Sequence, residues 1–163
     1  MKNSTTAERK SDRELVVTRT VNGPARLVFE AWSRPELFRQ WWVPKSFGMT
    51  LLSCEMDVRT GGTYRLVFKH PASGEPMAFF GRYIEVVPSA RIVWSNDESP
   101  DGAVTTVTFE EKDGKTLLVM SDLYPTKEAC DAAIESGSTS GFGETFDQLE
   151  DFLVTRGAGQ SKD

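Results

Sequence analysis

The sequence contains few residues of the kinds that metal, redox and disulfide chemistry requires. Only two cysteines, Cys54 and Cys130, occur in 163 residues, and their separation matches no zinc-binding or redox motif. We expect both to be buried, unreactive thiols, as free cysteines usually are. His70 is the only histidine, and its place beside Pro71 at the end of an expected strand predicts a solvent-exposed edge residue rather than a general base.

The sequence also lacks the motifs that identify several large enzyme classes. It contains no phosphate-binding Gly-Lys-Ser/Thr loop, no dinucleotide fingerprint, no His-Glu-x-x-His zinc motif and no Gly-x-Ser-x-Gly elbow. This argues against an ATPase, an oxidoreductase, a metalloprotease and a serine hydrolase. We therefore assign no catalytic residue, no metal ligand and no cofactor, and the pattern favours a protein that is not an enzyme without deciding the question.

Positive charge and long apolar runs are scarce as well. The formal net charge is −5, and no segment concentrates Lys and Arg. Phosphate contacts need such clusters, so nucleic acid is not expected as a partner and an anionic membrane surface is disfavoured. No apolar run approaches the roughly 20 residues that span a bilayer, and the polar N-terminus lacks the apolar stretch of a signal peptide. These features predict a cytoplasmic protein.

The composition is typical of one globular domain. Hydrophobic residues make up 39% of the chain and charged residues 26%. Residues 1–13 are polar and non-periodic, and residues 156–163 have the same character, so both segments are predicted to be disordered tails. Residues 14–155 are predicted to form a single domain.

The order of periodic segments predicts an α+β fold. Residues 15–21 are rich in β-branched side chains and predict a first strand, which Asn22-Gly23-Pro24 ends. A pair of short helices is expected over residues 24–33 and 36–42, because a proline ends each of them. Six further strands, joined by turn sequences into an antiparallel meander, are expected at residues 47–58, 63–69, 77–87, 91–95, 104–110 and 116–123.

Alternation within these strands gives the sheet one apolar face, and a long C-terminal helix over residues 126–155 is expected to cover it. Phe142, Phe146, Leu149 and Leu153 recur at helical spacing and are assigned to the inner side of the helix. Clustered glycine and serine predict a break near residues 136–141. The acidic residues assigned to the solvent side of the helix are Glu144, Asp147, Glu150 and Asp151.

Several local motifs sharpen this reading. They are Val28-Phe29-Glu30-Ala31-Trp32, Pro35-Glu36-Leu37, Trp41-Trp42-Val43-Pro44, Asp57-Val58-Arg59-Thr60-Gly61-Gly62 and Gly81-Arg82-Tyr83-Ile84-Glu85. With the order of elements, they resemble the START and birch-pollen-allergen (Bet v 1-like) superfamily, also called SRPBCC. The branch that they resemble most is the one named after the activator of Hsp90 ATPase homologue. One departure is Gly141-Phe142, where this branch usually has a Gly-Trp pair.

The resemblance implies a helix-grip fold, also described as Bet v 1-like or TBP-like. In such a fold a curved antiparallel sheet, here of about seven strands, wraps a long C-terminal helix, with a short helix pair after the first strand. The resemblance further implies an internal cavity, a possible chaperone partner and a role such as the stress response. It does not imply one activity, because members of this branch have several.

The apolar face and the covering helix predict a cavity lined by aromatic side chains. The candidate ligand-binding residues are Trp32, Trp41, Tyr64, Leu66, Phe68, Phe79, Trp94, Val107, Phe109, Phe142, Phe146 and Leu149. For each of them a filled hydrophobic core is the alternative. Arg82, Glu85 and Asp122 are the charged groups expected to approach the cavity, with a surface ion pair as their alternative.

Three functional hypotheses follow. The leading one is binding of a hydrophobic or aromatic small molecule, such as a lipid or a polyketide-like metabolite, without catalysis. The second, implied by the resemblance, is an interaction that modulates the ATPase of an Hsp90-type chaperone. The third is a cyclase or hydrolase that acts on the bound molecule, with Arg82, Glu85 or His70 transferring protons. A monomer and a homodimer are both compatible with the sequence.

Overall fold

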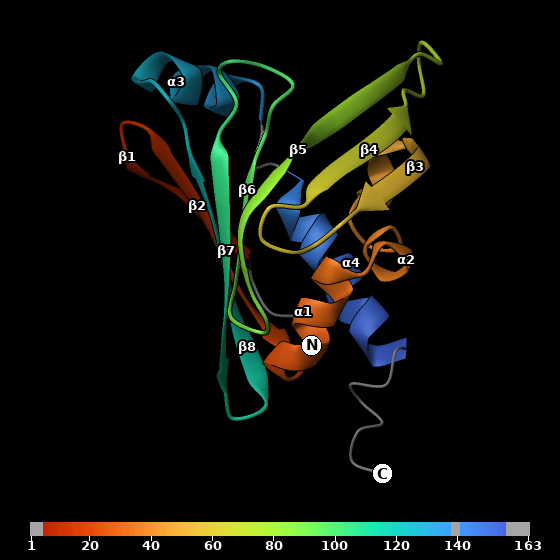
Figure 1. Ribbon diagram of the computed structural model, residues 1–163, viewed down its shortest axis with the longest axis vertical. Coiled ribbons are helices and arrows are strands. Elements are labelled where there is room, and N and C mark those ends of the chain that lie inside the picture. The colour runs from red at the N-terminus through yellow and green to blue at the C-terminus, as the bar shows by residue number, and fades with distance from the viewer. Residues whose placement is uncertain (1–4, 138–140, 156–163) are drawn as a thin grey trace.

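The computed structural model describes residues 5–137 and 141–155, in which an eight-stranded antiparallel sheet curves around a C-terminal helix. The strands are β1 Thr5–Ser11, β2 Glu14–Asn22, β3 Thr50–Met56, β4 Thr63–Lys69, β5 Pro76–Val87, β6 Arg91–Ser95, β7 Val104–Lys112 and β8 Lys115–Leu123. Their order across the sheet is β1-β2-β8-β7-β6-β5-β4-β3, so β3 to β8 form the predicted meander. This architecture confirms the predicted α+β, helix-grip fold (Figure 1).

Strand β1 corrects the prediction that residues 1–13 form a disordered tail. It pairs antiparallel with β2, with Thr5 opposite Arg19 and Ser11 opposite Glu14. Its side chains are exposed or half-buried at the sheet edge, so no apolar alternation marks it in the sequence. Backbone hydrogen bonds hold such a strand, and side-chain polarity does not report them. The sheet therefore has eight strands rather than about seven. The expected tail at residues 156–163 lies outside the described residues.

Two helices follow β2, and the second is shorter than expected. Helix α1 covers Ala25–Ser33, and α2 covers only Pro35–Phe38. Trp41 and Trp42 lie in the turn after α2 instead of inside a helix. A 3-10 turn, η1 at Lys45–Phe47, comes next, so the strand expected from residue 47 begins three residues later as β3.

The expected break in the C-terminal helix is present. Helix α3 covers Lys127–Glu135 and α4 covers Phe142–Thr155. Gly137, between them, has a φ of +76°, a left-handed conformation that glycine adopts at low cost and that ends a helix. Helix α4 lies along the concave side of the sheet, while α3 lies near the β1–β2 end (Figure 1). The central residues of the expected break, 138–140, are outside the described part.

One acidic residue assigned to the solvent side of α4 is buried instead. Glu150 has 5% of its surface exposed and faces β2, where Arg19 is 2% exposed. Arg19 donates to Glu150 Oε1 from Nε at 3.1 Å and from Nη2 at 2.5 Å. Glu150 Oε2 accepts from the amide of Asn22 at 3.1 Å. The paired arginine explains why helical spacing alone placed this carboxylate on the wrong side of α4.

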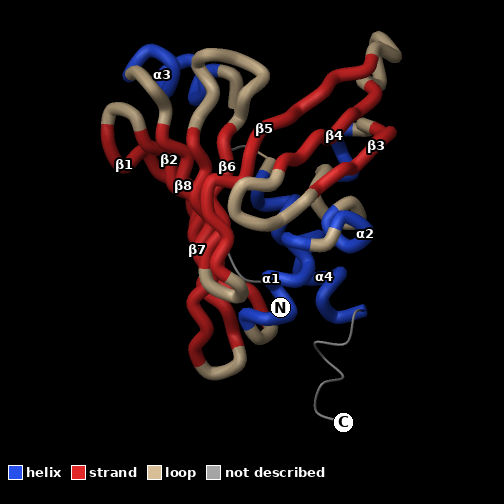
Figure 2. The backbone as a smooth tube through the Cα atoms, in the orientation of Figure 1, coloured by secondary structure: helices blue, strands red, loops and turns tan. Residues whose placement is uncertain are grey.

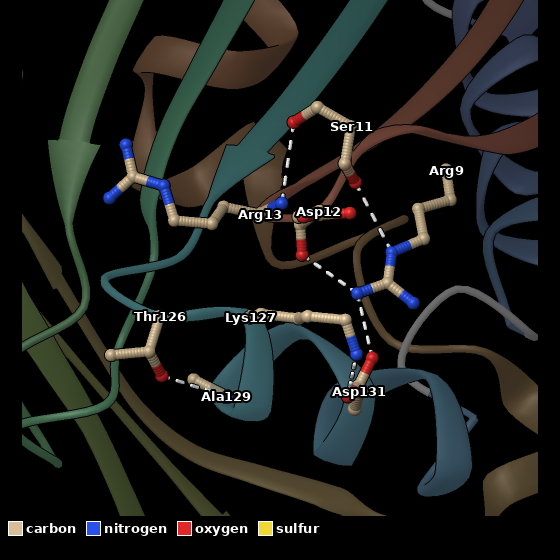
Figure 3. Close-up of polar contacts among 8 residues, drawn as sticks. All are labelled: Arg9, Ser11, Asp12, Arg13, Thr126, Lys127, Ala129 and Asp131. Atoms are coloured by element: carbon tan, nitrogen blue, oxygen red, sulfur yellow. Dashed lines mark hydrogen bonds and ion pairs between the residues drawn. The ribbon is translucent and has the colours of Figure 1, made fainter.

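Helix α3 is held against the β1–β2 turn by polar contacts, which Figure 3 shows. Arg9 of β1 donates from Nη2 to the Asp12 carbonyl at 2.7 Å and pairs with Asp131 of α3 at 2.7 Å. Lys127 pairs with the same carboxylate at 3.0 Å. Thr126 caps the helix, because its Oγ1 accepts from the Ala129 amide at 3.0 Å. The two cations hold the pKa of Asp131 below its ordinary value.

Strand β5 divides the sheet into two arms. Its first half, through Arg82, pairs with β4, and its second half, from Tyr83, pairs with β6. Gly81 lies at the end of the first half. An added Cβ at this position would lie 2.0 Å from the Ser95 carbonyl oxygen, so only glycine fits. One arm contains β1, β2, β8, β7 and β6, and the other contains β3 and β4, with α1 and α4 between them (Figure 2). This curvature creates the space that the site occupies.

Candidate functional site

A cavity of about 440 Å³ lies between the concave face of the sheet and the helices. Its wall is built by α1, α2 and the turn after it, strands β3 to β8, the β6–β7 loop, the residue after β8 and the first residue of α4. Most lining side chains are aromatic or aliphatic. The volume is within the roughly 300–1,000 Å³ typical of pockets for small ligands.

Trp32 of α1 is the centre of the aromatic end of the cavity. It is 2% exposed, and its ring meets those of Trp41 and Trp42 edge to face at centroid distances of 5.0 and 5.6 Å. Phe109 of β7 meets the same ring at 6.0 Å. The Trp32 Nε1 has no hydrogen-bond partner among the described residues. This end of the cavity is therefore apolar and aromatic, apart from the one indole N–H of Trp32, whose hydrogen is not used within the described residues.

The opposite end of the cavity is polar, and it lies where β6, β7 and β8 meet the β6–β7 loop. Four inward-facing residues form a row across adjacent strands, because Tyr83 pairs with Trp94, Trp94 with Thr105, and Thr105 with Asp122. All four line the cavity. Directly opposite positions on four neighbouring strands thus lead from two aromatic side chains, through Thr105, to the carboxyl group of Asp122.

A directed chain of hydrogen bonds ends at Asp122. Asn96 Nδ2 donates to the Ala103 carbonyl at 2.6 Å and to Thr105 Oγ1 at 3.1 Å. The Thr105 hydroxyl in turn donates to Asp122 Oδ1 at 2.6 Å. Tyr64 donates to the Ser95 carbonyl at 2.7 Å. Every donor hydrogen of these side chains is used within the wall, and no described residue donates to Asp122 Oδ2.

Burial changes the acid–base behaviour of three groups in the wall. Desolvation raises the pKa of Asp122, and the hydrogen bond from Thr105 opposes this only in part. Desolvation also raises the pKa of Tyr64 and of Tyr83, so both phenols remain protonated at neutral pH. Partial removal from bulk water thus shifts the acid–base equilibrium of each of these side chains toward its uncharged form.

The described residues contain no cluster of three or more His, Cys, Asp or Glu that could hold a metal ion. Within the same ranges, no helix combines the length and the apolar character that crossing a membrane requires. Cys54 Sγ is half-buried beside Met56 Sδ at 3.6 Å, and burial raises its pKa. Cys130 is fully buried.

Comparison with protein families decides which family this fold represents. The family model described as activator of Hsp90 ATPase homolog 1-like protein matches residues 22–154. The chain belongs to this family. The matched segment begins at the end of β2 and includes nearly all of α4, so every residue of the cavity wall lies inside it.

Solved structures agree with the family assignment. A Rhodobacter sphaeroides protein of 24% identity superposes with a TM-score of 0.84, covering 93% of this chain and 98% of its own. A Nitrosomonas europaea protein of 23% identity gives a TM-score of 0.81, covering 91% of this chain and 98% of its own. At these identities the likeness shows the fold alone. A Staphylococcus epidermidis protein of 28% identity gives 0.76, covering 93% and 94% of the two chains. A comparison with curated proteins found no match.

Many of the residues proposed from the sequence lie in the cavity wall of this family member. Strand alternation and helical spacing placed them correctly, although their binding of a ligand stays a prediction. The sequence-predicted residues that line the cavity are Trp32, Tyr64, Leu66, Phe68, Phe79, Trp94, Asp122 and Phe142.

Other predicted lining residues are part of the packed core. They are Trp41, Val107, Phe109, Phe146 and Leu149, each at most 5% exposed. The structure places these residues in the hydrophobic core, which is the alternative named for them. They lie where α1 and α4 press directly against the sheet, so no space remains beside them.

The other polar candidates lie outside the cavity. Arg82 points outward between the inward positions of Gly81 and Tyr83, and its Nε is 3.5 Å from Asp97 Oδ2. Glu85 pairs with Arg91 at 2.8 Å on the surface. Thus the surface ion pair, which was the alternative for both, is what the structure shows.

His70 caps the turn between β4 and β5, as an edge residue. Its Nδ1 accepts from the amide of Ala72 at 3.1 Å and from that of Ser73 at 3.4 Å. The side chain is half-buried and is not among those that line the cavity. These contacts give the histidine a structural role in the turn.

Sequence reasoning missed part of the polar end. Thr105 was assigned to the inner face, but its hydroxyl gave no reason to name it as a site residue. Asn96 and Glu98 come from the β6–β7 loop, where no periodicity indicates direction. Met120 and Ile92 could have been found by the alternation that placed Asp122 and Trp94.

Proposed function

We propose that this protein binds a small molecule with an aromatic or otherwise apolar body in the cavity between its sheet and α4. The observation that carries the proposal is an internal space of about 440 Å³ with an aromatic end and a carboxyl group at the other end. The cavity borders the hydrophobic core, because Trp32, Tyr64 and Leu66 belong both to its wall and to the core cluster. A few polar groups in an apolar pocket are what fixes the orientation of a ligand.

Tryptophan fluorescence gives a direct test, since three of the four tryptophans line the cavity. We expect 2-methylnaphthalene and biphenyl to bind, with a shift in tryptophan emission and a matching heat in titration calorimetry. Bound probe should also raise the Tm, because a ligand at 100 times its Kd adds about 2.7 kcal/mol to the free energy of unfolding. A folded protein that binds neither probe would contradict the proposal.

A matched pair of substitutions locates the binding. Ala103 lines the cavity and is 6% exposed, whereas its neighbour Val104 is 38% exposed and does not line it. Ala103→Phe should fill the cavity and weaken probe binding at least tenfold, while the protein stays folded. Val104→Phe adds a comparable ring on the other side and should bind the probe like the parent.

A second candidate function is modulation of a chaperone ATPase, and the description of the matched family favours it. It predicts that the purified protein changes the ATP hydrolysis rate of an Hsp90-type chaperone. Ala103→Phe separates the two roles, because a surface interaction would survive filling of the cavity. An unchanged chaperone rate at saturating protein would remove this candidate.

Catalysis on the bound molecule has lost its original support. Arg82 and Glu85, two of the proton-transfer groups named for a cyclase or hydrolase, form ion pairs on the surface. The third, His70, accepts amide hydrogen bonds in a turn. Among the polar candidates named from the sequence, Asp122 is the one that lines the cavity.

A further inference from the structure

The charged residues that line the cavity all have the same sign. Among the described lining residues these are Glu98 and Asp122, and no Lys, Arg or His joins them. Asp122 projects from the inner face of β8, on the same side as the buried Met120 and Leu118. A carboxylate on a ligand would meet like charge in a medium of low dielectric constant, which strengthens the repulsion.

Hydrogen-bond direction at the polar end adds a second argument. Asn96 has only donor hydrogens on Nδ2, so Thr105 Oγ1 must accept from it and must donate its own hydrogen to Asp122 Oδ1. The free capacity that remains at this end is mostly acceptor capacity. It includes Asp122 Oδ2 and Glu98 Oε1, since Glu98 Oε2 already accepts from the Phe80 amide at 2.9 Å. A ligand group that fits here must donate.

We propose that the cavity selects molecules that carry a basic amine on an aromatic body, with the amine at Asp122 and the aromatic body against the apolar wall. This rests on the proposed function and specifies its ligand class. An ammonium group supplies three donors and a positive charge, so it satisfies the free acceptors and offsets the charge of the two carboxylates. A hydroxyl supplies one donor and no charge, and a carboxylate supplies neither.

The aromatic wall near Asp122 favours the same chemistry. Trp94 lies in the same row of the sheet, two strands away from Asp122, with Thr105 between them. The aromatic body of a ligand whose ammonium lies at Asp122 can pack against Trp94 and Phe68, which also line the cavity. Aromatic rings gain attraction from offset and edge-to-face contacts with such side chains beyond the area that they bury.

Four probes with the same naphthalene skeleton test this selectivity by titration calorimetry at pH 7. They are 2-naphthylmethylamine, 2-naphthylmethanol, 2-naphthoate and 2-methylnaphthalene. We expect the amine to bind at least tenfold more tightly than the alcohol and the hydrocarbon, and the carboxylate to bind most weakly. Equal affinity for the amine and the hydrocarbon would overturn the inference but leave the proposed function standing. Failure of all four probes would overturn both.

Asp122→Asn gives the decisive variant, because asparagine keeps the acceptor for Thr105 and removes the charge. Its affinity for the amine should fall at least tenfold, and its affinity for 2-methylnaphthalene should stay within about twofold. Asp97→Asn is the matched control: it makes the same charge change one residue from Glu98, but on the outer face beside Arg82. An equal loss of amine binding in both variants would show that net charge, rather than Asp122, attracts the probe.

Discussion

At the scale of single residues, the two most informative side chains are a buried carboxyl group, Glu150, and a half-buried one, Asp122, with different surroundings. Glu150 is neutralised by Arg19 in direct contact and bridges β2 to α4. Among the described residues, no cation pairs with Asp122, and Thr105 is the one side chain that donates to it. The first arrangement holds the fold together, whereas the second leaves an acidic group available to the cavity.

Asp122 should reduce the stability of the empty protein at neutral pH. Burial raises the pKa of Asp122 above the ordinary 3.8. At pH values between the pKa of the unfolded state and that of the folded state, the folded state binds more protons, so stability falls as pH rises. Asp122→Asn removes this loss and keeps the bond from Thr105. The Tm of the variant should therefore match the parent near pH 4 and exceed it at pH 7, as measured by thermal unfolding. A lower Tm at pH 7 would show that the ionised group is stabilising.

Breaking the buried ion pair should be costly. After Glu150→Ala, the one carboxylate that still pairs with the buried Arg19 among the described residues is Asp147, whose side chain is 44% exposed, at 2.8 Å. We expect a loss of about 3 kcal/mol in the free energy of unfolding, measured by denaturant titration. Asp147→Ala removes the exposed partner and should cost less than about 1 kcal/mol. Similar losses in both variants would contradict the assigned difference in burial.

At the scale of elements, β5 and α4 decide the shape of the cavity. β5 belongs to both arms of the sheet, and the close approach at Gly81 lets it do so. α4 is fastened to the segment that carries Trp42: Gln148 Nε2 donates to the carbonyls of Trp41 and Val43 at 2.9 and 2.8 Å. The aromatic end is therefore held by backbone contacts as well as by ring packing.

The same chemical change at two glycines should have opposite effects on stability. Gly81→Ala places a methyl group on the Ser95 carbonyl and should cost about 2–3 kcal/mol. Gly143→Ala meets no atom within 4 Å in α4, and should stabilise by up to about 1 kcal/mol through helix propensity. Denaturant unfolding of both variants measures this, and a neutral Gly81→Ala would contradict the close approach.

At the scale of the whole molecule, the sheet joins distant parts of the chain. β2 and β8 pair along their full lengths, from Glu14 opposite Leu123 to Asn22 opposite Lys115. The sheet is therefore complete only when β2 has paired with β8, which is far away in the sequence. Such pairing makes folding depend on non-local contacts. β1 adds an outer edge to this closed unit and contributes no residue to the cavity wall.

Removal of residues 1–12 should therefore leave the cavity intact. We expect affinity for 2-methylnaphthalene within about twofold of the parent. Stability should fall by about 1–2 kcal/mol, because Arg19 loses Thr5 as an acceptor at 2.9 Å and α3 loses the Arg9 pair. The newly exposed β2 edge should also increase aggregation, seen by light scattering. Loss of probe binding in a folded truncated protein would contradict this division of roles.

The sequence by itself determined the elements and the inner faces of the strands, because burial on one face imposes a period of two in strands and of 3.6 in helices. Hence Tyr64, Leu66, Phe68, Trp94 and Asp122 could be placed inward before the structure was known. Tertiary structure alone decided which inward residues line open space. Val107 and Phe109 follow the same alternation as Thr105, yet helices press on them and not on Thr105.

Tertiary structure also decided every feature that depends on a partner distant in the sequence. Glu150 can be buried because Arg19 lies directly opposite it in space, although the two residues are 131 positions apart in the sequence. β1 is a strand because β2 presents an edge to it, although its own side chains carry no apolar signal. Arg82 faces solvent because Gly81 must face Ser95. Periodicity reports only the average surroundings of a residue, whereas pairing and cavity shape depend on which segments meet.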